Sequence, residues 1–264
     1  MSSEQQDFYV GYLPTPATLA RWYRVFVPVL ILAAASFGYW LAGSQQAAGT
    51  GTWAYGQSRT VSGRLVATPY PHVVTPTGES VLLVREGKLG VDDWAQPNDG
   101  RIVAVTGYAI ERGAWHMLEI ATESAIDVQS DAAIDVVVPT IQLFGEHTLS
   151  GEIVDSKCFL GVMKPGDGLV HRACAELCIR GGLPPMLVAA SPDGERAGYL
   201  LIAPDGSSAK ALVAGSVGIP VTITGTVSEV GALRYLTMAD TTIEALALAT
   251  NDTGDWCALP VAGG

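Results

Sequence analysis

Three of the four cysteines of this chain and one of its histidines occur together between residues 155 and 185. His171, Cys174 and Cys178 are separated by three and then four residues, so on a helix their side chains would lie on one face. Cys158 precedes them, at the end of a predicted strand. We therefore expect three sulfur atoms and one imidazole to converge, and such a group of side chains can hold a metal ion.

Three kinds of chemistry are open to this cluster. A set of three cysteines and one histidine suits tetrahedral Zn²⁺, and these soft ligands also admit Cu(I) or an iron–sulfur centre. Alternatively, Cys158 pairs with Cys174 or Cys178 in a disulfide, with Cys257 available for the remaining cysteine. The third interpretation is a reactive thiol, although neither Cys174 nor Cys178 lies at a helix N-terminus. The candidate metal ligands are Cys158, His171, Cys174 and Cys178, and no catalytic residue is assigned.

A short helix must carry most of these ligands. The sequence predicts this helix over Val170–Arg180, after a Lys-Pro-Gly-Asp-Gly turn at 164–168 and before the helix-ending pair at 181–182. The segment 155–185 follows the first predicted strand of a β domain. Because loops on a rigid scaffold commonly carry function, we expect the functional site in this segment.

The part of the chain after about residue 58 contains two similar halves. Residues 62–66 match residues 150–154, and residues 105–114 match residues 223–232. The two matches occur in the same order, which predicts a duplicated domain. The second pair is offset by more residues than the first, so the second copy carries the segment 155–185 as additional chain.

Both halves have the composition of small β domains. Short segments rich in Val, Ile, Thr and aromatic residues alternate with Gly, Pro and Asp, which indicates strands and turns. Four or five short strands per half suit a small closed barrel, and their order resembles an OB-like barrel. The predicted strands are Thr60–Ala67, Val81–Arg85, Ile102–Glu111 and Trp115–Thr122, then His147–Val154, Met186–Ala190, Tyr199–Ala203, Pro220–Glu229 and Leu233–Ala239.

A long apolar segment precedes the β domains. We predict a transmembrane helix at residues 21–43, which would contact the lipid bilayer through residues 22–42. Arg21 and Arg24 lie at its start, so the positive-inside rule places the N-terminus in the cytoplasm and the bulk of the chain outside. A signal peptide cleaved near residues 47–49 is the alternative.

The composition excludes some functions. The chain has 15 Lys and Arg against 26 Asp and Glu and a net charge of −11, which argues against binding to nucleic acid. The sequence shows no Ser/His/Asp order, no phosphate-binding glycine loop and no recognisable carboxylate pair, so an enzyme is not predicted. His72 is interpreted as a loop or surface histidine, and His116 and His147 as structural or surface histidines.

One part of the chain resembles a known family. Asp155-Ser156-x-Cys158 is followed by His171-x-x-Cys174-Ala175-x-x-Cys178 and by a hairpin segment of the form V-x-I-T-G-T-V-x-E-x-G. Over residues 147–246 this pattern resembles a family of uncharacterised bacterial exported OB-like proteins. The resemblance implies an OB-like fold and the positions of the site, but no reaction. The first half departs from the pattern, because it has Ala-Thr-Pro-Tyr at 67–70.

These observations define an expected organisation and function. We predict a mainly β protein with one N-terminal transmembrane helix and two tandem OB-like barrels, the second with a helical Cys/His insertion. We expect it in the bacterial inner (plasma) membrane with the barrels in the periplasm.

The expected function is that of an accessory subunit of an integral membrane complex, and an electron-transfer complex is the favoured host. The alternative is a separate periplasmic metal-binding or thiol-redox protein. The predicted parts are a cytoplasmic stub (1–20), the membrane helix (21–43), a linker (44–58), the first domain (59–130), a linker (131–146), the second domain (147–248, with the insertion at 155–185) and a tail (249–264).

Overall fold

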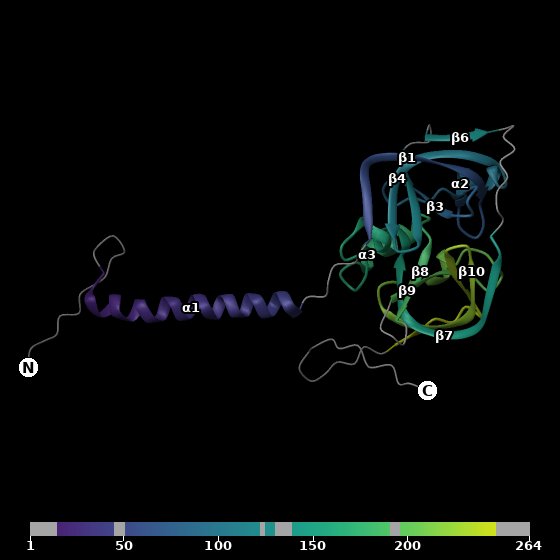
Figure 1. The fold of residues 1–264 in the computed structure, drawn as a ribbon. Helices are drawn as coiled ribbons and strands as arrows, with labels where there is room; N and C mark the ends of the chain where they lie inside the picture. The colour runs from purple at the N-terminus through teal and green to yellow at the C-terminus, as the bar shows by residue number, and fades with distance from the viewer. Residues whose placement is uncertain (1–14, 45–50, 122–124, 130–138, 191–195, 247–264) are drawn as a thin grey trace, which may run out of the picture. The chain divides into compact units, whose positions relative to one another are not determined.

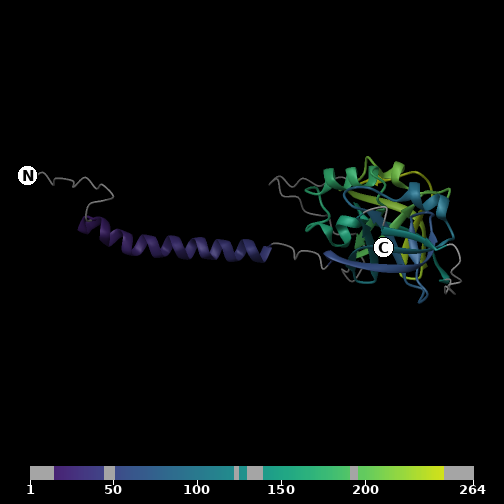
Figure 2. The same cartoon turned by 90° about the horizontal axis from the view of Figure 1, so that it is seen from above.

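The computed structural model describes residues 15–44, 51–121, 125–129, 139–190 and 196–246. The chain divides into two compact units, Met1–Ala48 and Gly49–Gly264, and each is described here by itself. Figures 1 and 2 show the helix of the first unit and the strands of the second. The predicted tail at 249–264, which includes Cys257, lies outside the described residues.

The first unit contains a single described helix, α1 (Ala17–Ser44). It contains the predicted membrane segment, begins four residues before it, and has Pro28 inside. The stretch Ala17–Gly43 is long and apolar enough to cross a membrane, with a mean hydropathy of 2.0, and its side chains are not buried. A helix of this kind, close to the N-terminus, is either a membrane anchor or a signal sequence.

The second unit begins with a closed five-stranded barrel. Its first strand pairs on one side with the second strand and on the other side with the fourth, and the third and fifth strands run parallel to each other. The helical turns α2 (Asp92–Ala95) and η1 (Gln96–Asn98) join the third strand to the fourth. The barrel strands are β1 (Thr52–Val66), β2 (His72–Val74), β3 (Ser80–Arg85), β4 (Ile102–Arg112) and β5 (Trp115–Ile120), and β6 (Ile126–Gln129) adds to β4.

A second closed five-stranded barrel repeats this order of strands. Its first strand pairs with its second and fourth, and its third and fifth strands are again parallel. The helix α4 (Lys210–Val213) joins the third strand to the fourth. The barrel strands are β7 (Ile141–Asp155), β8 (Pro185–Ala190), β9 (Arg196–Ile202), β10 (Pro220–Val230) and β11 (Leu233–Met238), and β12 (Glu244–Ala245) pairs with β10.

Glycines of the two halves occupy corresponding places. Gly63 lies in β1 and Gly151 in β7, where an added Cβ would meet the backbone of the neighbouring strand at 2.2 Å and 2.3 Å. Gly113 and Gly231 lie in the β4–β5 and β10–β11 hairpins, with φ of +57° and +62°. Glycine is needed in the first pair for close approach of two strands and in the second pair for the left-handed turn.

The strands extend further than the sequence indicates. β1 begins at Thr52 and β7 at Ile141, inside the two ranges predicted as linkers. Each of these strands crosses a glycine with positive φ, Gly56 at +80° and Gly145 at +89°, at which its pairing with the neighbouring strand shifts register. These irregularities break the alternation of apolar and polar residues, which is the signal that sequence reasoning follows.

The two barrels share a hydrophobic core. One cluster of buried side chains includes Leu82, Ile110 and Met117 from the first barrel and Met186 and Leu200 from the second. Figure 1 shows the first barrel, in blue to teal, beside the second, in teal to yellow. Because this apolar surface is buried between them, we conclude that the barrels form one packed body.

Polar contacts also join the barrels. The hydroxyl of Tyr70, from the first barrel, donates a hydrogen bond to the carbonyl of Leu201 and accepts one from the amide of Ala209 at 3.1 Å. The Nζ of Lys210 lies 2.9 Å from a carboxylate oxygen of Asp92. These contacts fix the orientation of one barrel against the other.

Candidate functional site

The candidate site lies in the segment that connects β7 to β8, and Asp155 sets its geometry. This residue ends β7, is fully buried, and accepts a hydrogen bond at Oδ1 from the backbone amide of Cys158 at 2.8 Å. The chain then turns directly into the short helical segment η3 (Cys158–Val162). Cys158 therefore follows the end of β7, as the sequence predicts, and its side chain is buried.

Close backbone packing holds η3 in place. A Cβ added to Gly166 would lie 2.4 Å from the carbonyl oxygen of Cys158, and one added to Gly161 would lie 2.6 Å from the carbonyl oxygen of Thr52. Arg112, at the end of β4, donates a hydrogen bond to the carbonyl of Phe159 at 2.6 Å and stacks over its ring. The segment that carries Cys158 is thus fixed by both barrels.

The remaining ligands lie on or beside α3 (Arg172–Arg180). His171 is the N-cap of this helix, one residue before its first, and its carbonyl accepts a hydrogen bond from the amide of Ala175 at 3.0 Å. Cys174 and Cys178 lie on the helix, one turn apart. The helix ends as predicted, with the amides of Gly181 and Gly182 donating to helix carbonyls.

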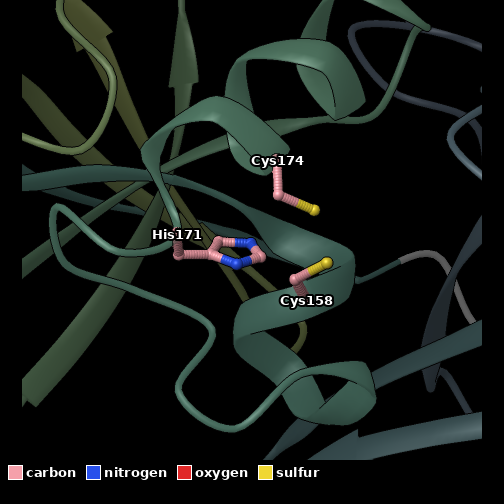
Figure 3. Close-up of side chains that lie close together, drawn as sticks. All are labelled: Cys158, His171 and Cys174. Atoms are coloured by element: carbon pink, nitrogen blue, oxygen red, sulfur yellow. The ribbon is translucent and has the colours of Figure 1, made fainter.

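The ligand atoms fall into two overlapping groups. Those of Cys158, His171 and Cys174 all lie within 4.8 Å of one another, and Figure 3 shows these three side chains pointing toward a common space. Those of Asp155, Cys158 and Cys178 form the second group, again within 4.8 Å. The structure therefore brings the predicted ligands together in two groups of three, and Cys158 belongs to both groups.

The orientation of His171 is set by Asp155. Its Nε2–H donates to the carboxylate Oδ2 at 3.0 Å, and both side chains are buried. The other carboxylate oxygen is already engaged by the amide of Cys158. In the neutral tautomer that donates from Nε2, Nδ1 keeps the free lone pair of the imidazole. An aspartate that orients a histidine in this way is the usual partner of a metal-binding imidazole.

A lysine of the first barrel lies against the sulfur atoms. Nζ of Lys88 donates to Sγ of Cys174 at 2.7 Å, and it lies 3.5 Å from Sγ of Cys178. Burial lowers the pKa of Lys88, but the hydrogen bonds and charges of the two sulfurs outweigh it and leave the pKa raised. The hydrogen bond from Cys158, helped by Lys88, lowers the pKa of Cys178 to about 7, whereas the pKa of Cys158 is raised by that hydrogen bond and by burial.

A second lysine, Lys157, is buried and extends from the second barrel toward the first. Lys157 of the second barrel lies 2.5 Å from the carboxylate of Glu119 in the first, and each side chain is 2% exposed. Its Nζ also donates to the carbonyls of Arg85 and Gly87, at 3.0 Å and 2.7 Å. These two residues lie three positions and one position before Lys88 in the chain. Lys157 thus anchors the loop that presents Lys88 to the sulfurs.

The structure distinguishes between the predicted states of the cysteines and also places His72. The three described cysteines, Cys158, Cys174 and Cys178, are free thiols, so neither predicted disulfide is formed among them. His72 lies in β2 and is buried, with its Nδ1 2.9 Å from the carbonyl oxygen of Tyr70. It is therefore a core residue of the first barrel, and the prediction of a loop or surface position was wrong.

Sequence reasoning missed two residues of the site. Asp155 is part of the quoted motif, but its place directly after the predicted strand His147–Val154 and three residues before Cys158 was the only signal of its role. Lys88 gave no signal, because it lies far from the cysteines in the sequence and reaches them only through the packing of the two barrels.

No protein-family model, no curated protein and no solved structure matches this chain. The site is therefore interpreted from its own chemistry. Three sulfurs, one oriented imidazole and a neighbouring ammonium group converge in a largely buried space. Such donors can bind a soft metal ion, or can act as thiols.

Proposed function

We propose that this protein is a membrane-anchored metal-binding protein, whose ion is held by Cys158, His171 and Cys174 with Cys178 beside them. The single observation that carries the proposal is the convergence of these ligand atoms within 4.8 Å around a histidine held by Asp155. A histidine held by a carboxylate also activates a thiol nucleophile, but such a nucleophile needs only one sulfur, whereas the sulfurs of Cys158 and Cys174 both converge with the imidazole. The metal-binding interpretation accounts for both sulfurs and for the histidine.

The chemistry of the ligands limits the metal. Thiolate and imidazole ligands favour Zn²⁺, Cu(I) and iron–sulfur centres over the hard cations Mg²⁺ and Ca²⁺. Iron–sulfur clusters are mostly held by four cysteines, and the described cluster has three. Zinc and copper are therefore the two metals that the proposal retains.

Metal analysis of the full chain tests the proposal. The detergent-solubilised protein, purified under reducing and anaerobic conditions, should hold one equivalent of zinc or copper. We expect His171→Ala and Cys174→Ser to lose most of this metal. His147→Ala is the matched control, because His147 is exposed on β7 and bonds only to the carbonyl of Phe144 among the contacts described. A metal-free protein with reactive cysteines would contradict the proposal.

The fold of the barrels supports a second part of the proposal. We infer that both barrels are OB-like, since each closes with the strand order first, second, third, fifth, fourth and has helical turns between its third and fourth strands. Only residues 67–71 separate β1 from β2, whereas residues 156–184 separate β7 from β8. On this interpretation the segment with η3 and α3 is an insertion in the second copy.

The location follows from α1. We propose that α1 is a retained membrane anchor with its N-terminus in the cytoplasm, supported by Arg21 and Arg24 at its start. Protease added to intact spheroplasts should then remove both barrels and leave an anchor fragment. Full protection of the barrels would contradict this orientation.

One observation favours a second candidate function. The first half of β7 carries Ile141, Leu143 and Phe144, whose side chains are all exposed. Exposed apolar side chains in a cluster are typical of surfaces that bind another protein. We propose as the alternative that the protein is an accessory subunit of an integral membrane complex. Purification from solubilised membranes tests it: stoichiometric membrane subunits should accompany the wild-type chain and be lost from Leu143→Lys, and a monomeric wild-type chain would contradict it.

A further inference from the structure

We propose that Lys88, a residue of the first barrel, makes the cluster select the monovalent soft cation Cu(I) over divalent Zn²⁺. This inference rests on the proposed metal-binding function and names the ion that the site takes. It also gives the first barrel, which contributes none of the four ligands, a part in the site.

Lys88 is held in position by contacts on several sides. Its carbonyl oxygen lies so near Gly181, at the end of α3, that a Cβ there would clash with it. The amide of Gly90 donates to the carbonyl of Gly181 at 2.8 Å. Lys157 also donates hydrogen bonds to the carbonyls of Arg85 and Gly87. These contacts hold the loop that contains Lys88 against α3. The ammonium group therefore stays beside the sulfurs.

The ammonium group of Lys88 repels a bound cation, and this repulsion weakens the binding of a divalent ion more than that of a monovalent ion. An ion about 2.3 Å from Sγ of Cys174 would lie roughly 4 Å from Nζ of Lys88, which is 2.7 Å from the same sulfur. Coulomb repulsion from the lysine is twice as large for Zn²⁺ as for Cu(I). Lys88 is partly exposed, so solvent screens the effect, and we expect a bias of about tenfold toward the monovalent ion.

The arrangement of the ligands supports the same choice. The first group offers three ligand atoms, from Cys158, His171 and Cys174. Cys178 belongs to the other group, and Lys88 reaches both Cys174 and Cys178, at 2.7 Å and 3.5 Å. Structural Zn²⁺ almost always takes four ligands, whereas Cu(I) is satisfied by two or three soft ones. A three-ligand group with an ammonium beside it therefore suits Cu(I) better.

Competition between the two metals tests the proposal. Affinities for Cu(I) and Zn²⁺ are measured on the solubilised full chain without oxygen, each against a chromophoric chelator of known affinity. We expect Lys88→Met to move the ratio of the two affinities about tenfold toward Zn²⁺. Lys88→Arg, which keeps the charge, should remain near the wild-type ratio. The control is Lys164→Met, which removes a charge from an exposed position in the loop after η3.

The outcomes separate the two proposals. A wild-type chain that binds neither metal overturns both the proposed function and the role of Lys88. A wild-type chain that binds metal, with a ratio in Lys88→Met within twofold of its own, overturns only the role of Lys88. Where Lys88→Met fails to fold, Lys88→Gln is measured by the same criterion. A shift in the ratio of the two affinities is informative, because a purely structural role of Lys88 would weaken the binding of Cu(I) and of Zn²⁺ to the same extent.

Discussion

The buried ion pair between Lys157 and Glu119 should be the most sensitive polar contact between the barrels. We consider the substitution Glu119→Gln, which keeps the size of the side chain and removes its charge. Lys157 would then keep its hydrogen bonds to the carbonyls of Arg85 and Gly87 but would have lost its counter-ion.

The size of the effect follows from burial. Both side chains are 2% exposed, so water cannot solvate the charge that remains. Breaking a buried ion pair by removing one partner typically destabilises a protein by about 3–5 kcal/mol. Replacing both charged partners with neutral residues, as in Lys157→Met with Glu119→Gln, should cost much less than the single changes suggest, because no isolated charge is left. The coupling free energy between the two positions should therefore be about 3 kcal/mol.

Urea unfolding of the solubilised chain, followed by tryptophan fluorescence, measures this free energy. The matched control is Glu229→Gln, which breaks the partly exposed pair between Glu229 and Arg234 and should cost no more than about 1 kcal/mol. If Glu119→Gln cost no more than the control, the reasoning from burial would be refuted.

Three further results are expected. Asp155→Asn should weaken metal binding by about 10–100-fold in chelator competition, as loss of an orienting carboxylate does elsewhere; unchanged affinity would mean that Asp155 only ends the strand. Gly166→Ala should lower the free energy of unfolding by about 2 kcal/mol or more, because its Cβ would lie 2.4 Å from a backbone oxygen, whereas Gly215→Ala, with open space around it, should be neutral. Burial raises the pKa of Tyr70 from 10 to about 12, so its contribution to stability is complete below pH 10 and is lost as the pH rises toward 12; Tyr70→Phe should flatten the dependence of stability on pH in this window, and an equal slope in both proteins would contradict it.

Much of the β structure could be predicted from the sequence. All nine predicted strands occur, within a few residues at their ends apart from the early starts of β1 and β7, because their apolar residues follow a simple pattern between Gly, Pro and Asp. Gly113 and Gly231 occupy the same place in the matching segments 105–114 and 223–232, because the left-handed turn of each hairpin calls for glycine. The short strand β2 was missed because its three residues are too few to show alternation.

The site could be predicted only in part. The spacing of His171, Cys174 and Cys178 was enough to bring the ligands together, because neighbouring turns of one segment fix their separation. The contact of Lys88 with the sulfurs depends on how the barrels pack, and no local pattern encodes it. The choice between a disulfide and free thiols also depended on distances that the spacing alone does not fix.

The core cluster that the two barrels share restricts how this chain can be divided into separate domains. In many tandem proteins each copy is a module that can be lost, swapped or expressed alone. Here side chains such as Leu82 and Leu200 are covered by a cluster that draws on both copies, and Tyr70 of one copy hydrogen-bonds to the backbone of the other. A chain cut between the barrels would expose apolar surface on both pieces. Each barrel also has a core cluster of its own, so the shared cluster is the part in which a substitution in one barrel must be accommodated by side chains of the other.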